Sequence, residues 1–153
     1  MITVKFTTWN NDPLHKKLFL RTTPHSSGRW ENVQFLFDEG DDEDSMFDYW
    51  VIFEHLPKRE TVYCSRKNCI FIAGECSSVR AYNQSFLNQF ARVITIQRRI
   101  TTPRPYYQFP DATWYPHKSY DELYGHDTVP KSKLLSIVVS NKSFTPGHKK
   151  RLE

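Results

Sequence analysis

The sequence contains few glycines, few cysteines and no long apolar run, and each shortage excludes a class of protein. No apolar stretch approaches the roughly 20 residues that a transmembrane helix needs. The five glycines form neither a G-x-G-x-x-G nor a G-x-x-x-x-G-K-[ST] pattern, which argues against a dinucleotide-binding or P-loop enzyme. Residues 1–12 lack a charged segment followed by an apolar one, so the sequence predicts a protein that is made and kept in the cytosol.

The three cysteines and six histidines do not form a known metal-binding pattern. Cys64, Cys69 and Cys76 are spaced C-x4-C-x6-C, without the paired C-x2-C of zinc sites. The histidines show no H-E-x-x-H spacing. We therefore expect reduced thiols and no metal, with a disulfide between Cys64 and Cys69 as the alternative.

The charge of the chain is basic but uneven. The formal net charge is +4, yet residues 38–44 hold six of the 17 acidic residues. We expect this acidic run to form an exposed loop, and the remainder to be strongly basic. Such a remainder suits an anionic ligand such as a nucleotide-sugar, a nucleic acid or an acidic membrane face, unless the charges only solvate the surface. No helix-turn-helix, zinc-finger or aromatic RNA-binding signature is present, so nucleic acid is disfavoured.

The apolar pattern predicts strands and helices in alternation, and aromatic residues, at 15% of the chain, argue for a folded core. The predicted strands are residues 2–8, 33–37, 48–53, 62–64, 70–73 and 92–97, and the predicted helices are 14–20 and 82–91. Alternation of this kind favours an α/β fold with a mostly parallel, Rossmann-like sheet and flanking helices.

The last third of the chain has a different composition. Residues 101–130 hold five of the nine prolines and many aromatic residues, which predicts an ordered loop with a short helix near 119–124. Residues 131–140 form a strongly apolar strand pattern, and 148–153 begin a helix. A chain that stops one turn into a helix, just after a new strand, is expected to be truncated.

One carboxylate, Glu75, follows the apolar run 70–73 and precedes a polar turn and the helix pattern at 82–91. Ligands of open α/β sheets bind where strands end, because strand ends and helix N-termini together form a crevice. A carboxylate placed there can serve as a base. The alternatives are a hydrogen bond to a bound sugar, or an ordinary solvated acid in a turn.

Three segments of the chain resemble the α-1,3/1,4-fucosyltransferases of glycosyltransferase family 10. Residues 48–54, DYWVIFE, resemble the family strand "DYWVVF". Residues 73–78, AGECSS, followed by Asn83, Phe86 and a strand, resemble its "E-x-P-S…F" segment. Residues 133–151, which contain Ser140-Asn141 and end at Arg151, resemble the start of its donor domain, "K…SN…R".

The resemblance implies a GT-B fold, in which two Rossmann-like domains enclose the active site. Residues 1–125 would be the acceptor-binding domain, and residues 126–153 a linker and the incomplete first strand-loop-helix of the donor domain. The family transfers fucose from GDP-fucose to a glycan hydroxyl with inversion and without a bound metal or other cofactor. With most of the nucleotide site missing, the fragment alone is expected to be inactive.

The resemblance also suggests roles for individual residues. Glu75 matches the acidic residue on the acceptor side and would be the base. Arg151 would contact the diphosphate from near a helix N-terminus; the alternative is an ordinary exposed arginine. Ser140 and Asn141 would line the same crevice; the alternative is that they cap a turn. Four residues in predicted loops or at strand ends are candidates for stacking on the acceptor glycan or for hydrogen bonding to it: Trp9, His25, Trp30 and His117. The alternative for the two tryptophans is that they anchor the packing of the core.

Two functions therefore remain open. The first is an enzyme whose partners are a GDP-sugar and a glycan acceptor, which would be an N-acetylglucosamine-containing bacterial surface polysaccharide. This enzyme would lie in the cytoplasm or at the inner face of the membrane, where peripheral attachment is an option. The second is a non-catalytic α/β module that binds a glycan or a protein. A natural gene that continues into further strand-helix units would favour the enzyme.

Overall fold

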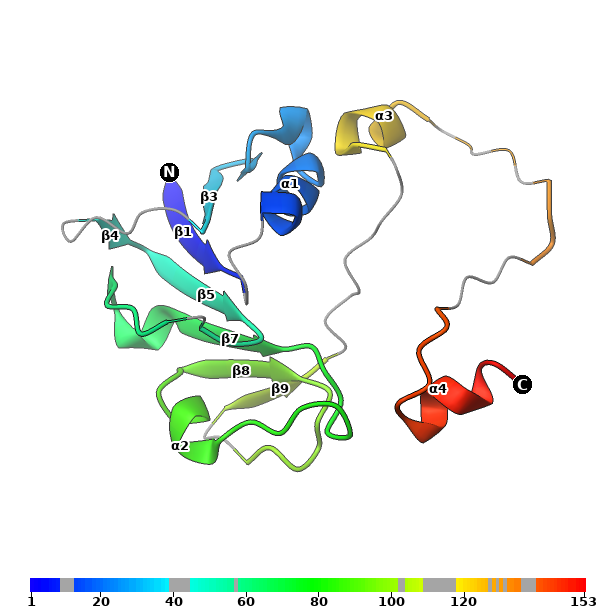
Figure 1. Cartoon of the computed structure of the whole chain (residues 1–153). Coiled ribbons are helices and arrows are strands. Elements are labelled where there is room, and N and C mark those ends of the chain that lie inside the picture. Colours follow the sequence, from blue (N-terminus) through cyan, green and yellow to red (C-terminus); the bar gives the residue numbers. More distant parts are fainter. Residues whose placement is uncertain are drawn as a thin grey trace.

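The computed structural model describes residues 1–8, 13–38, 45–56, 58–101, 104–108, 118–126, 128, 130, 132–135 and 140–153 (Figure 1). The helices, in chain order, are α1 (Pro13–Arg21), the 3-10 turns η1 (Pro24–Ser26) and η2 (Arg66–Asn68), α2 (Gln84–Leu87), α3 (Tyr120–Tyr124) and α4 (Pro146–Lys150). The strands are β1 (Ile2–Thr7), β2 (Arg29–Trp30), β3 (Val33–Phe37), β4 (Met46–Phe47), β5 (Tyr49–Phe53), β6 (Tyr63–Cys64), β7 (Cys69–Ala73), β8 (Arg92–Thr95) and β9 (Pro105–Tyr107).

The fold is α/β, built on a mostly parallel sheet of seven strands in the order β2-β3-β1-β5-β7-β8-β9. All neighbouring pairs are parallel except β2 with β3. A separate pair, β4 with β6, is also parallel. The chain order reverses between β1 and β5, because β3 lies on one side of β1 and β5, β7, β8 and β9 follow on the other. Crevices for ligands form at such a switch point, outside the carboxyl ends of the strands.

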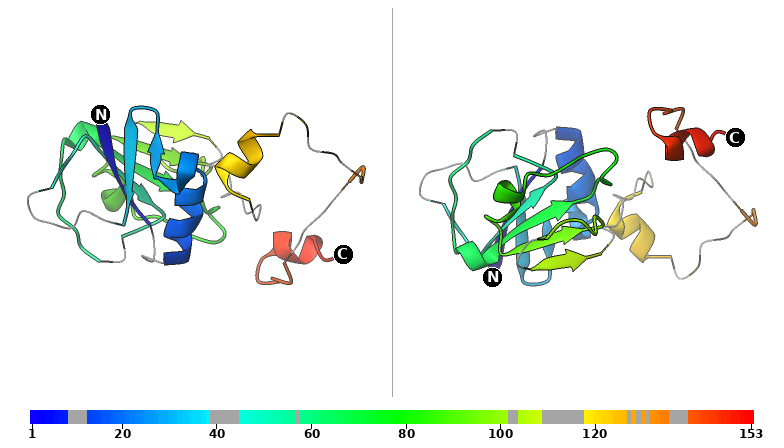
Figure 2. Two further views of the ribbon diagram at one scale, coloured as in Figure 1. Left: turned by 90° about the horizontal axis from the view of Figure 1, so that it is seen from above. Right: turned by 90° about the horizontal axis from the view of Figure 1, so that it is seen from below.

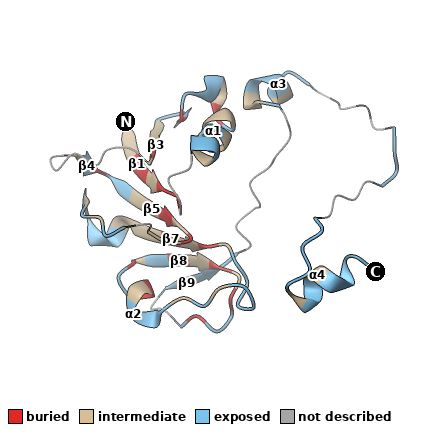
Figure 3. Cartoon of the chain, viewed as in Figure 1, coloured by how far each residue is buried: buried red, intermediate tan, exposed pale blue. Residues whose placement is uncertain are grey.

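The two faces of the sheet pack against different helices, because successive strand residues point to opposite sides. On one face Ile52, Phe71 and Val93 form a fully buried core with Leu87 of α2. The other face carries Phe6, whose ring lies 5.0 Å from that of Phe19 in α1. Buried residues concentrate along the central strands (Figure 3).

The segment after β9 returns to the amino-terminal part of the chain before it leaves the sheet. Helix α3 is capped by a reciprocal box between Ser119 and Glu122, and it contacts η1 through Asp121, which accepts a 2.7 Å hydrogen bond from the His25 backbone N–H. Helix α4 lies apart from the sheet in every view (Figures 1 and 2). Among the described residues, no helix is long and apolar enough to cross a bilayer.

The structure confirms the predicted strands at β1, β3, β5, β6, β7 and β8 and the predicted helices at α1 and α3. The helix predicted over 82–91 is shorter in the structure. It starts at Gln84, after the N-cap Asn83, whose side chain accepts a hydrogen bond from the Ser85 N–H, and it ends at Leu87. The prediction that 101–130 holds no strand is wrong, since β9 pairs with β8.

The strand predicted over 131–140 is not seen where the chain is described, at 132–135 and at 140. Residues 131 and 136–139 lie outside the described residues, as do residues 39–44 of the acidic run.

Candidate functional site

Polar residues follow the parallel strands at the carboxyl edge of the sheet. Thr8 follows β1, Asp38 follows β3, Glu54 follows β5, Glu75 lies two residues after β7, and Gln97 two residues after β8. Asp38 links the ends of β3 and β1, because its carboxylate accepts a 2.6 Å hydrogen bond from the Thr8 N–H. The other three belong to one hydrogen-bonded cluster over β5, β7 and β8.

Glu54 is the buried carboxylate of this cluster, with 7% of its surface exposed. Its Oε1 accepts a 2.6 Å hydrogen bond from the Gly74 N–H, and its Oε2 accepts from the Tyr82 hydroxyl. The Arg80 guanidinium lies 3.9 Å from Oε2. A buried charge is costly unless it is paired and hydrogen-bonded, and these three partners meet that requirement. The backbone φ of Glu54 is +72°, so the chain turns sharply as β5 ends.

The same cluster also holds the backbone of Glu75. The Glu75 carbonyl accepts a 2.8 Å bond from the Gln97 side-chain amide, which also donates to the Arg80 carbonyl over 2.9 Å. The Tyr82 hydroxyl, which donates to Glu54, lies close to the Glu75 backbone. The Glu75 side chain itself is exposed. The structure therefore fixes the peptide of Glu75 and presents its carboxylate to solvent at the carboxyl edge.

Two ionisable groups of the cluster have shifted pKa values. The pKa of Tyr82 is raised, first by burial and then by its hydrogen bond to Glu54, so the phenol stays protonated. The pKa of His55 is lowered, first by burial and then by the Arg80 guanidinium, whose Nη1 lies 2.9 Å from Nδ1 of His55. A neutral imidazole can accept this hydrogen bond at Nδ1, and that leaves Nε2 as a donor.

A pocket of about 360 Å³ opens beside this cluster, a size within the range of small-ligand sites. It is lined by Glu54, His55, Leu56, Arg80, Ala81, Tyr82, Asn83 and Phe86. Its lining combines polar side chains with the apolar side chains of Leu56 and Phe86. A mixed lining of this kind suits a sugar ring, which has hydroxyls at its edge and C–H groups on its faces.

The other residues predicted for the site are not brought to Glu75. Trp30 pairs with Val33, the first residue of β3, and therefore lies at the amino end of the parallel sheet, whereas Glu75 lies at the carboxyl end. His25 lies in η1, and its backbone N–H donates to Asp121. Trp9 and His117 lie outside the described residues.

The three residues predicted to contact the donor lie in the carboxyl-terminal segment. Ser140, Asn141 and Arg151 are exposed. Arg151 is the C-cap of α4, whose N-cap is Thr145. The expectation that Arg151 lies near a helix N-terminus is therefore wrong, because the helix starts before the basic run rather than within it.

Sequence reasoning missed Tyr82 and Gln97 as members of the site and considered Glu54 only as part of a strand motif. Glu54 carries the same signal as Glu75, a carboxylate just after an apolar run. Tyr82 and Gln97 carry no local signal, because their bonds reach 28 residues back to Glu54 and 22 residues back to Glu75.

Within the described residues, no group of three or more His, Cys, Asp or Glu side chains is placed to hold a metal ion. Comparisons with family models, with curated proteins and with solved structures find no match to this chain.

Proposed function

We propose that this chain is the acceptor-binding part of an inverting glycosyltransferase that moves fucose from GDP-fucose to a glycan hydroxyl, with Glu75 as the general base. The observation that carries the proposal is the exposed carboxylate of Glu75 at the carboxyl edge of a parallel sheet, on a backbone whose carbonyl accepts a hydrogen bond from Gln97. The resemblance of residues 48–54 and 73–78 to the fucosyltransferase segments supports it. A mostly parallel α/β sheet is compatible with one half of a GT-B fold.

The chemistry asks for a base in a fixed position. An acceptor hydroxyl gives its proton to a Glu75 carboxylate oxygen while the hydroxyl oxygen attacks the anomeric carbon of fucose. The bond from that carbon to the diphosphate breaks, and GDP leaves with the electron pair. General-base catalysis of this kind contributes about 10²- to 10⁴-fold to the rate. The Gln97 hydrogen bond to the Glu75 carbonyl fixes the backbone that carries the base, which favours the positioning that such catalysis requires.

The pocket beside Tyr82 is the proposed acceptor site. The side chains of His55 and Asn83 line it, and Phe86 offers an apolar wall. Of the residues predicted to contact the acceptor, Trp30 lies at the opposite end of the sheet from Glu75.

The donor side of the proposal rests on the carboxyl-terminal segment. Arg151 would contact the diphosphate, because guanidinium groups bind phosphate oxygens in bidentate fashion, and Ser140 and Asn141 would line the same crevice. The reaction would use neither a bound metal nor another cofactor. With a nucleotide-sugar donor and a surface-polysaccharide acceptor, it would take place in the cytoplasm, at or near the inner face of the membrane.

The experiment compares wild type with Glu75→Gln in GDP release from GDP-fucose, over N-acetyllactosamine and related acceptors. It uses the natural polypeptide that carries this chain. The matched control is Glu31→Gln, which changes an exposed carboxylate in the turn between β2 and β3, at the amino end of the sheet. We expect Glu75→Gln to lower kcat by about a hundredfold or more, with little change in acceptor KM, and Glu31→Gln to leave both unchanged.

Acceptor binding is tested on the chain itself. N-acetyllactosamine should shift the amide resonances of His55 and Asn83 in a saturable way. Binding without turnover by the natural polypeptide would favour the non-catalytic glycan-binding module. Turnover that is unaffected by Glu75→Gln would return Glu75 to an ordinary turn carboxylate.

A further inference from the structure

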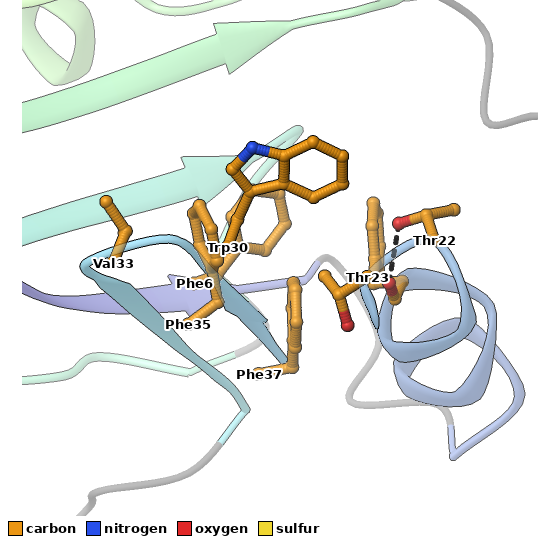
Figure 4. Close-up of a pocket in the computed structure, with 8 residues that line it drawn as sticks. Phe6, Thr22, Thr23, Trp30, Val33, Phe35 and Phe37 are labelled. Carbon is orange, nitrogen blue, oxygen red and sulfur yellow. Dashed lines mark hydrogen bonds between the residues drawn. The ribbon is translucent and has the colours of Figure 1, made fainter. Parts of the chain in front are cut away.

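A second pocket lies on the face of the sheet that α1 covers, opposite the face that packs against α2 (Figure 4). Its volume is about 340 Å³. It is lined by Phe6, Phe19, Thr22, Thr23, Trp30, Val33, Phe35 and Phe37, and we call it the aromatic pocket. Trp30 and Val33 mark the amino end of the sheet, so the aromatic pocket is separate from the cluster that holds Glu75.

The walls of the aromatic pocket are fixed by ring contacts. Phe19 and Phe37 are stacked, with centroids 5.3 Å apart and planes inclined by 9°, and Phe35 stacks on Phe37 at 5.9 Å. Trp30 closes the pocket from β2, and its ring is met edge-on by Tyr120 of α3 at 5.0 Å. Because α3 is tied to η1 by the Asp121 bond to His25, this wall is held by a second element.

The side-chain hydroxyl groups of the lining already donate hydrogen bonds within the protein, and the Trp30 indole N–H is the exception. The hydroxyl of Thr22 donates to the Phe19 carbonyl over 2.6 Å, and that of Thr23 donates to the Leu20 carbonyl over 2.6 Å. The Trp30 indole N–H makes no hydrogen bond to a described residue. A sugar entering here would lose hydrogen bonds to water without replacing them, which costs free energy for each unpaired group. The lining therefore suits an apolar ligand with at most one acceptor directed at Trp30.

The volume and the aromatic walls of the pocket further limit the kind of ligand that it can bind. An apolar protein cavity of about 150 Å³ binds benzene, so 340 Å³ has room for about two fused rings. Aromatic groups gain from offset and edge contacts with ring walls beyond the area they bury. We propose that the aromatic pocket binds a flat, largely apolar aromatic group of about two rings, independently of the Glu75 site.

The probe for this proposal is 1-naphthol, which carries two fused rings and one hydroxyl. It is titrated into the ¹⁵N-labelled chain while the indole N–H resonances are followed, with Trp30 assigned through Trp30→Phe. Trp50 is the internal control, because its indole N–H donates to Thr7 Oγ1 over 3.0 Å on the α2 side of the sheet. We expect a saturable shift of the Trp30 resonance and no shift of the Trp50 resonance.

Two variants test the location. Val33→Phe places a ring into the pocket and should weaken 1-naphthol at least tenfold, whereas Val79→Phe, at a position 43% exposed in the turn after β7, should leave its affinity unchanged. Should Val33→Phe fail to fold, nuclear Overhauser contacts from the naphthol ring to the Val33 and Thr22 methyl groups in wild type locate the ligand instead. A shift that does not saturate, an absence of these contacts, or saturation by decanoate but not by 1-naphthol would overturn the proposal.

Discussion

A Cβ atom added at Gly74 would lie 2.6 Å from Oε1 of Glu54, the same oxygen that accepts the Gly74 N–H bond. The backbone just after β7 thus approaches this buried carboxylate so closely that a side chain at position 74 would force the carboxylate to move. Glycine is needed here for space, because real Cβ atoms do not approach other atoms so closely.

Gly74→Ala should therefore destabilise the protein. The new methyl group must displace the Glu54 carboxylate from its three partners, and we expect the free energy of unfolding to fall by about 1–3 kcal/mol in urea titrations. Gly125→Ala is the matched control, because its Cβ would meet only the Asp121 carbonyl at 4.0 Å. Equal stability of the two variants would contradict the close approach at Gly74.

The hydroxyl of Tyr82 donates to the buried carboxylate of Glu54, so Tyr82→Phe removes this hydrogen bond. Loss of a buried hydrogen-bond donor costs about 1–3 kcal/mol, and we expect a loss in that range at neutral pH. Tyr124→Phe, at an exposed tyrosine, should leave stability unchanged.

The stability gap between wild type and Tyr82→Phe should also depend on pH. The folded protein holds the pKa of Tyr82 above its ordinary value, so the unfolded chain loses this proton first, near a pH of about 10. Wild type accordingly loses stability as the pH rises beyond that value, whereas the Phe variant lacks this contribution. The gap should narrow in urea titrations between about pH 8 and pH 11. A gap that stays constant would contradict a raised pKa.

Much of the fold could be predicted from the sequence, because the apolar runs at β5 and β7 are typical of buried parallel strands. The place of Glu75 followed from the rule that ligand sites form where such strands end. The hydrogen-bonded cluster around Glu54 and Glu75 could not be predicted in this way. Tyr82 is bonded to a residue 28 positions away, and such a pairing is set by packing of α2 on the sheet rather than by local pattern.

The acceptor residues predicted on composition show a second limit. A tryptophan in a loop can stack on a sugar or serve as a packing anchor, and the sequence does not decide between these roles. The antiparallel pairing of β2 with β3 carries Trp30 to the amino end of the sheet, away from Glu75. The strand β2 has only two residues, which is too short for a periodic pattern that would predict this pairing.

His55 should titrate below the ordinary histidine value of about 6.5. Burial is the larger cause and the Arg80 guanidinium the second, so Arg80→Gln should raise the pKa of His55 only part of the way back. Because the folded pKa is lowered, the unfolded chain takes up a proton first, and this contribution to stability is lost as the pH falls through about 6.5. Proton NMR titration of the imidazole measures the shift. Arg92→Gln, at an exposed arginine on β8, serves as the control and should not move it.

The three cysteines are free thiols, and their surroundings predict an order of reactivity. Cys76 is exposed, and the hydroxyl of Ser78, 3.0 Å away, is the main cause of its lowered pKa. Burial, and then the neighbouring Cys69, raise the pKa of Cys64 to about 11. Since the thiolate is the nucleophile, iodoacetamide near neutral pH should modify Cys76 at least about ten times faster than Cys64.

Mass spectrometry of the labelled peptides measures these rates. Ser78→Ala removes the hydrogen bond to Cys76 and should slow its alkylation without changing the rates at Cys64 and Cys69. Labelling in concentrated urea should bring the three rates together, because unfolding removes both the burial of Cys64 and the Ser78 contact. Equal rates in the folded protein would contradict the burial of Cys64. Resistance of Cys64 and Cys69 to alkylation until a reductant is added would instead reveal the disulfide that their spacing permits.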